Sequence, residues 1–95
     1  MLDFYADWCV SCKEMERYTF SDASVQQKLS GFIKLQADVT GNAPEHQALL
    51  QRFRLFGPPG IIFFDREGRE VSALRVVGFQ PAAKFAAVLD KALGR

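Results

Sequence analysis

A strand runs directly into a cysteine pair and a helix in the stretch Leu2-Asp3-Phe4-Tyr5-Ala6-Asp7-Trp8-Cys9-Val10-Ser11-Cys12-Lys13. Its opening residues are mostly aromatic or aliphatic, which is typical of a buried strand. From Cys9 to about Tyr18 the residues favour a helix, with Met15 and Tyr18 three positions apart on one face. The sequence therefore predicts that both cysteines lie where the first strand passes into the first helix.

The rest of the chain predicts one α/β domain built around a mixed sheet. Apolar patterns predict further strands over residues 32–39, 61–64 and 70–77, and helices over 21–30, over 44–56 and from Pro81 onward. A strand–helix–strand unit forces a parallel pair with a right-handed crossover, and the turn at 65–69 makes the last two strands an antiparallel hairpin. The predicted fold class is therefore α/β, with a four-stranded mixed sheet and helices on both of its faces.

Apolar side chains are expected where the sheet and the helices meet. In residues 32–39, Ile33 and Leu35 share the drier face of the predicted strand with Ala37 and Val39. Five phenylalanines are expected in the core: Phe53, Phe56, Phe63, Phe64 and Phe85.

Charge and length exclude several classes of protein. Twelve Lys and Arg against eleven Asp and Glu give a net charge of +1, without the basic surface that a nucleic-acid binder needs. No apolar run approaches the ~20 residues of a membrane-spanning helix. A chain of 95 residues leaves room for one domain only. We therefore expect no nucleic-acid partner and no membrane insertion by this segment.

The two cysteines, Cys9 and Cys12, are too few for the framework of a small disulfide-rich scaffold and are better explained as reactive groups. At the start of a helix, unpaired backbone N–H groups and the positive end of the helix dipole stabilise a thiolate on Cys9. Cys9 is therefore the predicted nucleophile. Cys12, one turn deeper, can attack a mixed disulfide formed on Cys9 and close an internal disulfide, so it is the predicted resolving thiol.

Two other roles for the cysteine pair carry less weight. A structural zinc site needs about four ligands, and beyond the two thiols the chain offers only His46, in a distant predicted helix. We expect His46 to be an exposed helix residue and no metal to be bound. A purely structural bridge across so short a loop would remove little chain entropy.

Asp3 lies six residues before Cys9, inside a strand that should be buried. Burial of an unpaired carboxylate is costly, so the pKa of Asp3 should be raised, and Asp3 should accept or donate the proton of Cys12 through a water. The alternative is an exposed Asp3 at a sheet edge. Lys34 either approaches Asp3 from the neighbouring strand or, as the alternation favours, is exposed to solvent.

These features resemble those of the thioredoxin superfamily, in the strand, the cysteine motif, the helix and the loop Gly57-Pro58-Pro59 before the hairpin. More closely, the sequence resembles the C-terminal periplasmic domain of the DsbD family of bacterial thiol:disulfide interchange proteins. The segments that carry this likeness are Tyr5–Glu14, Tyr18–Asp22 and Leu35–Thr40. The resemblance implies a single thioredoxin-like domain over residues 1–95, excised from a larger membrane protein and lacking the usual leading strand and helix. Without that strand, residues 32–39 are expected at an edge of the sheet.

The resemblance implies a protein-disulfide reductase that passes two electrons through the Cys9–Cys12 pair, with this redox-active disulfide and no bound cofactor. Its partners would be protein thiols and disulfides, with electrons coming from the membrane-embedded domain of the same parent protein and going to its N-terminal periplasmic domain. From there they would reach a disulfide isomerase and the cytochrome c maturation pathway, which implies a periplasmic location. One alternative is a general thioredoxin-like reductase with other partners, and another is a binding module whose cysteines are incidental.

The resemblance also implies roles for residues around the cysteines. Pro59 matches the cis-proline that faces the cysteine pair, and Pro58, the residue before it, has no N–H to donate to an extended substrate. Recognition is then expected to rely on apolar contact from Trp8, Pro58 and Phe79. The alternatives are core packing for Trp8 and a merely stiff loop for the two prolines.

Glu16 matches a second acidic residue near the cysteines of the DsbD domain. Together with Asp3 it would hold the pKa of Cys9 high, whereas the alternative is a solvated helix charge. The residues between the cysteines, Val10 and Ser11, include no His to add positive charge beside the thiolate. We therefore predict a reducing potential.

Overall fold

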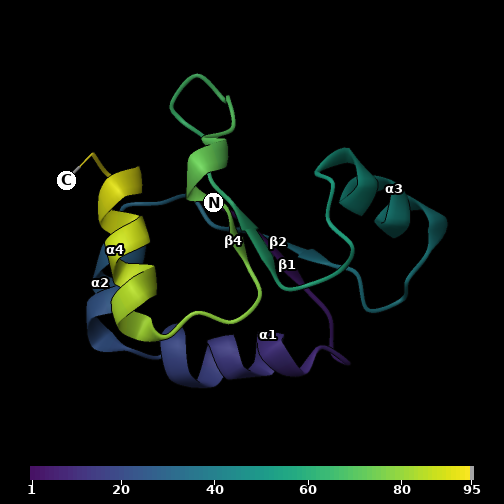
Figure 1. Cartoon of the computed structure of the whole chain (residues 1–95), viewed down its shortest axis with the longest axis horizontal. Helices are drawn as coiled ribbons and strands as arrows, with labels where there is room; N and C mark the ends of the chain where they lie inside the picture. Colours follow the sequence, from purple (N-terminus) through teal and green to yellow (C-terminus); the bar gives the residue numbers. More distant parts are fainter. Residues whose placement is uncertain (95) are drawn as a thin grey trace.

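A computed structural model of the chain describes residues 1–94 and contains one four-stranded sheet in the order β2-β1-β3-β4 (Figure 1). The strands are β1 (Leu2–Tyr5), β2 (Leu35–Asp38), β3 (Gly60–Ile62) and β4 (Val76–Val77). The helices are α1 (Val10–Glu14), the π-helical turn η1 (Met15–Thr19), α2 (Ala23–Leu29), α3 (Pro44–Arg52), the 3-10 turn η2 (Ser72–Leu74) and α4 (Ala82–Ala92).

The opening strand β1 lies in the interior of the sheet. It pairs in parallel with β2, so that Asp3 lies opposite Gln36, and antiparallel with β3, so that Asp3 lies opposite Ile61. Strand β4 then pairs antiparallel with β3. The predicted mixed sheet, one parallel crossover followed by a hairpin, is therefore confirmed.

Helices cover both faces of the sheet, as predicted. On one face, Phe4 and Ile62 pack in a cluster with Leu50 of α3. On the other face, residues of β3 and β4 pack with η1, α2 and α4. Figure 1 shows α3 on the opposite side of the sheet from α2 and α4. The core residues of that second face are Met15, Val25, Leu29, Ile61, Phe63, Val76, Phe85 and Leu89.

The helix after the cysteines is continuous but changes its winding. Helix α1 passes into η1 without a break, and the N–H of Phe20 donates to the carbonyl of Met15 five residues earlier, at 2.7 Å. Helix α2 then begins after Asp22, whose Oδ1 accepts from the N–H of Val25 at 3.1 Å. Both predicted helices are confirmed, whereas the sequence pattern did not predict the π-helical turn.

The predicted strand over 70–77 is wrong in its middle. Glu70 forms an isolated bridge with Phe64, η2 follows, and regular pairing resumes only in β4. The guanidinium of Arg75 donates through Nη2 to Oε1 of Glu70 at 2.8 Å and through Nε to Oε2 of the same carboxylate. This fork draws the two ends of the segment together, so the residues between them turn out of the sheet.

One of the five predicted core phenylalanines, Phe56, is fully exposed instead. Arg54 adopts a left-handed conformation (φ 57°), and the next side chain, Leu55, turns inward and is buried. Leu55 fills the space above Gly60, where an added Cβ would lie 2.8 Å from Leu55 Cδ1. Phe56 is therefore directed to solvent because its neighbour occupies the inward position.

The other four phenylalanines lie in the core or at its margin, which is closer to the expected burial. Phe63 and Phe85 are buried, and Phe53 packs edge-on against Phe4 and Phe64. Phe64 is 39% exposed, so it lies at the margin of the core.

Strand β2 is an edge of the sheet, as predicted, but part of its apolar face is exposed to solvent. Ile33 is 82% exposed and Leu35 is 61% exposed. Ile33 also precedes the strand, and its carbonyl accepts from the amino group of Met1 at 2.8 Å. The expectation that both side chains face the core is wrong: Ile33 lies before the strand, and Leu35 lies on an edge strand, beside which no further strand of residues 1–94 pairs.

The helices are short. Among the residues that the structure describes, none of them has both the length and the apolar character to cross a membrane.

Candidate functional site

Cys9 and Cys12 form a disulfide at the start of α1, with their Cα atoms 5.2 Å apart. Cys9 is the N-cap residue of the helix, and its Sγ accepts from the backbone N–H of Cys12 at 3.1 Å. Both residues are buried. The predicted placement is confirmed: the sulfur of Cys9 lies where unpaired helix N–H groups and the helix dipole favour negative charge.

Cys12 is directed inward, toward the opening strand. Its Sγ lies 4.0 Å from the carbonyl oxygen of Phe4, a residue that is fully buried in the sheet. Cys9 instead adjoins exposed residues on both sides, Trp8 and Val10. Both cysteines are buried, but the Cys9 sulfur accepts from a helix N–H whereas the Cys12 sulfur faces the carbonyl of Phe4, so the two sulfurs differ in environment.

Strand register brings several loops to one end of the sheet. Phe4 lies opposite Gly60, Gly60 lies opposite Val77, and Tyr5 lies opposite Asp38. The carboxyl ends of β1, β2 and β4 therefore meet the amino end of β3. The segments brought together at this end are residues 6–12, 39–43, 58–59 and 78–79.

Trp8 is exposed over 56% of its surface, so the core-packing alternative for this residue is wrong. Its Nε1 donates to the carbonyl oxygen of Thr40 at 3.0 Å. The backbone N–H of the preceding residue, Asp7, donates to Thr40 Oγ1 at 2.9 Å. Thr40 was not among the predicted site residues, since a threonine in a loop carries no signal by itself.

Pro58 and Pro59 are joined by a cis peptide bond, which confirms the isomer that the resemblance implied. Pro59 is buried, Pro58 is half-buried, and the carbonyl of Pro59 accepts from the N–H of Gly78 at 3.2 Å. The next residue, Phe79, is 40% exposed. The two predicted binding segments, 58–59 and 78–79, are therefore held side by side.

Several apolar side chains are exposed in, or close in sequence to, the segments that meet at this end of the sheet. None of them is needed to fill the core, because each leaves a large part of its surface in solvent. They are Trp8, Val10, Phe56, Val77 and Phe79.

Asp3 is a half-buried carboxylic acid in the central strand, so the alternative of an edge-exposed residue is wrong. Loss of solvent around the carboxyl, and then the negative charge of Glu16, raise its pKa to about 6. Glu16 itself is exposed on η1. Among residues 1–94, neither sulfur forms a hydrogen bond with Asp3.

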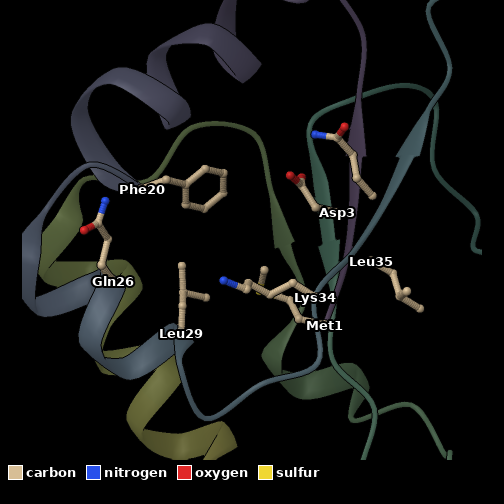
Figure 2. Close-up of a pocket in the computed structure, with 8 residues that line it drawn as sticks. Met1, Asp3, Phe20, Gln26, Leu29, Lys34 and Leu35 are labelled. Atoms are coloured by element: carbon tan, nitrogen blue, oxygen red, sulfur yellow. The ribbon is translucent and has the colours of Figure 1, made fainter.

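The Asp3 carboxyl opens into a pocket of about 520 Å³ between the β1–β2 edge and α2. Figure 2 shows Asp3 and the amine of Lys34 extending into this pocket. Within the described residues no ion pair joins them. Lys34 therefore combines the two predicted possibilities, since it shares the Asp3 pocket and is exposed. The full lining is Met1, Asp3, Phe20, Gln26, Leu29, Lys34, Leu35 and Gln36.

A chain of hydrogen bonds that links Lys13, Tyr5 and Asp7 was also not predicted. Lys13 Nζ donates to the hydroxyl of Tyr5 at 2.5 Å, and that hydroxyl donates to Asp7 Oδ1 at 2.9 Å. The bond to Tyr5 is the main cause that raises the pKa of Lys13, whose side chain is exposed. Residues on both sides of the cysteine pair are thus tied to the end of β1.

The expectation that His46 is an exposed helix residue is wrong, because its side chain has a structural role that the sequence did not indicate. It is half-buried, and its Nδ1 accepts from the backbone N–H of Ala43 at 3.1 Å, which caps the start of α3. Among residues 1–94 no three His, Cys, Asp or Glu side chains are grouped so that they could hold a metal ion.

Comparisons with a family model and with curated proteins both give matches over nearly the whole chain. Residues 1–93 match the family model of the thioredoxin-like domain. The chain is 60% identical over 94 residues to the thiol:disulfide interchange protein DsbD of Ralstonia nicotianae, covering 99% of this chain and 15% of that protein. It thus spans about 15% of the length of the curated relatives it matches.

Solved structures resemble it over most of their length. The C-terminal domain of DsbD from Neisseria meningitidis is 46% identical and matches 95% of this chain and 76% of that one. The TM-score is 0.84 for its oxidised form and 0.82 for its reduced form.

Proposed function

The chain belongs to the thioredoxin-like family, among the C-terminal domains of DsbD proteins, and from that premise we propose that it catalyses thiol:disulfide interchange with other proteins. One observation carries the proposal: Cys9 and Cys12 form a disulfide whose first sulfur caps α1. A helix N-terminus stabilises the thiolate that such exchange needs. No other cysteine occurs in the chain.

The reaction is written for the reduced chain. The Cys9 thiolate attacks a disulfide of the partner protein, forming a mixed disulfide and releasing one partner thiolate. The Cys12 thiolate then attacks Cys9 Sγ, which forms the Cys9–Cys12 bond and releases the second partner thiolate. Two electrons pass from this chain to the partner, and the two cysteine protons balance the two thiols formed. The reverse sequence with a dithiol donor returns the chain to its reduced form.

Asp3 is proposed to accept the proton of Cys12 as that thiol attacks. A carboxyl with a pKa of about 6 is partly ionised near neutral pH, so it can both take and return a proton. Glu16 is proposed to assist by raising that pKa through its charge. A water between Asp3 and Cys12 would carry the proton.

Trp8, Pro58, Pro59 and Phe79 are proposed to bind an extended segment of the partner beside the disulfide. The exposure of Trp8 and Phe79 supports an apolar contact. Pro58 has no N–H, so main-chain pairing at this position can use only carbonyl oxygens.

We further propose that the chain is one domain of a longer protein and works in the periplasm. In that setting it would take electrons from a membrane-embedded domain and pass them to an N-terminal periplasmic domain, and onward to disulfide isomerase and cytochrome c maturation proteins. The proposal is supported by the 60% identity to a DsbD protein of which the chain covers 15%.

Partner trapping tests this function. We expect a reduced Cys12→Ser variant to form stable mixed disulfides with partners through Cys9, because the resolving thiol is missing. Cys9→Ser is the matched control and should trap nothing and reduce no protein disulfide. A chain that keeps its activity as Cys9→Ser would be a binding module with incidental cysteines, which contradicts the proposal.

The direction of electron flow is tested by equilibrium with glutathione buffers. We expect a reducing potential near that of thioredoxin, about −270 mV, since no His lies between the cysteines. A potential as oxidising as that of a disulfide isomerase, about −180 mV, would contradict this direction.

A further inference from the structure

We propose that Thr40 is a positioning residue, which holds the loop of residues 6–9 so that Cys9 stays at the helix N-terminus and Trp8 keeps one orientation. This inference rests on the proposed exchange function. It assigns a role to a residue that neither touches the disulfide nor belongs to α1.

Two hydrogen bonds from the loop converge on Thr40. The backbone N–H of Asp7 donates to Thr40 Oγ1 at 2.9 Å, and the indole Nε1 of Trp8 donates to the Thr40 carbonyl at 3.0 Å. These two donors belong to the residues directly before Cys9. The loop that presents the nucleophile is thus fixed to the end of β2, an element distant in the sequence.

Thr40 is itself held in place by Asp38, the last residue of β2. Asp38 Oδ1 accepts from the backbone N–H of Thr40 at 2.9 Å and also from the Thr40 hydroxyl. Because that hydroxyl donates to Asp38, its lone pairs remain directed at the Asp7 N–H. These bonds to Thr40 also lower the pKa of Asp38, which is therefore a carboxylate at neutral pH.

The consequence concerns Cys9 because the loop is short. The N–H of Cys9 donates to the carbonyl of Ala6 at 3.1 Å, so the loop turns tightly just before the nucleophile. If Asp7 and Trp8 lose their contacts with Thr40, this turn is free to move. The sulfur then spends less time at the N–H groups of α1 that stabilise its thiolate.

The first test compares Thr40→Val, which is similar in shape but lacks the hydroxyl, with Thr40→Ser, which retains it. Cys9 is alkylated with iodoacetamide as a function of pH in a reduced Cys12→Ser background. We expect Thr40→Val to lower the rate at pH 7 by roughly three- to tenfold, the equivalent of one hydrogen bond, and to displace the profile to higher pH. Thr40→Ser should restore both.

The control is Ser30→Ala, which removes a hydroxyl bond to the Gln27 carbonyl at the end of α2. This variant should leave the Cys9 profile unchanged. Trp8 is the only tryptophan in the chain, so its fluorescence anisotropy reports on the loop directly. We expect anisotropy to fall in Thr40→Val and not in the control.

An unchanged profile and anisotropy in Thr40→Val would overturn the inference, as would equal impairment in Thr40→Ser. If Thr40→Val does not fold, Asp38→Ala and Asp38→Asn decide instead, since the amide oxygen can still accept from Thr40. Asp38→Ala should then slow alkylation and Asp38→Asn should not. These readouts need no partner protein. A wild-type chain that fails to exchange with protein disulfides would therefore refute the proposed function without deciding the role of Thr40.

Discussion

Asp3 is the residue whose chemistry departs most from ordinary behaviour. Its position follows from the sequence, because an acidic residue set into an apolar strand next to a cysteine motif predicts a buried carboxyl. The surroundings of Asp3 could not be predicted from the sequence. The pocket that exposes one side of Asp3 depends on how α2 and the residues before β2 pack. Local pattern thus predicts which groups are unusual, whereas their solvation depends on tertiary contacts.

Replacement of Asp3 by Asn should stabilise the oxidised chain above pH 6. Folding raises the pKa of Asp3 from 3.8 to about 6, so folding favours the protonated acid. Its contribution to stability is fully present below pH 4 and is lost as the pH rises through 6. We expect Asp3→Asn to raise the free energy of unfolding in urea at pH 8 by up to about 3 kcal/mol, with no difference at pH 3.5. Glu45→Gln, on exposed α3, is the charge control, and an equal gain at both pH values would refute this assignment.

The two carboxylates should also act on the nucleophile. In the reduced chain, Asp3→Asn and Glu16→Gln each remove negative charge near the cysteine pair, so each should lower the pKa of Cys9. Ultraviolet absorbance of the thiolate in a Cys12→Ser background measures this directly. Unchanged titration in both variants would show that neither carboxylate tunes Cys9.

At the scale of elements, the sequence predicted well where local and global preferences agree. The helix after Cys9 and the helix start at Pro44 each satisfy a local backbone requirement and were confirmed, and the structure shows that Asp22 caps the helix predicted over 21–30. The strand over 70–77 failed because an Arg75–Glu70 ion pair, a side-chain contact, overrides strand propensity there. Phe56 failed because Leu55 takes the inward position that apolar patterning would give to either residue.

The packing of Leu55 over Gly60 gives a prediction about the start of β3. A Cβ at residue 60 would lie 2.8 Å from Leu55 Cδ1 and 3.2 Å from Cδ2. Leu55 is buried and cannot simply swing away. We expect Gly60→Ala to cost about 1–3 kcal/mol of unfolding free energy. Gly57→Ala, where nothing lies within 4 Å of the added Cβ, is the control in the loop before β3. Equal effects of the two substitutions in thermal unfolding would contradict this packing argument.

For the whole molecule, the sheet register explains why one end is reactive. Parallel pairing of β1 with β2 and antiparallel pairing of β3 and β4 direct the cysteine loop, the Thr40 loop, the cis-proline loop and Phe79 to the same end. The convergence of the first and third of these was expected from the resemblance to the thioredoxin superfamily, in which a cis-proline faces the cysteine pair. The contact with Thr40 depends on the length of the loop after β2, which no periodic pattern in the sequence specifies.

A second feature of the whole molecule is the outer edge of β2, which pairs with no other strand of the sheet. Ile33 and Leu35 are exposed beside it, so the isolated 95-residue chain should self-associate through this edge as its concentration rises. We expect size-exclusion elution to shift earlier with concentration. Leu35→Lys should abolish the shift, and Val10→Lys, on exposed α1, should not. Elution that is independent of concentration would contradict the prediction.

The central claim is that Cys9 and Cys12 together transfer two electrons to a protein disulfide. The most direct measurement mixes the reduced chain with oxidised insulin, quenches with acid and determines intact masses. We expect the chain to lose two hydrogens as insulin gains two, the Cys12→Ser variant to stop as a covalent adduct through Cys9, and Cys9→Ser to remain unchanged. Transfer that persists in Cys9→Ser, or no transfer by the wild-type chain, would contradict the claim.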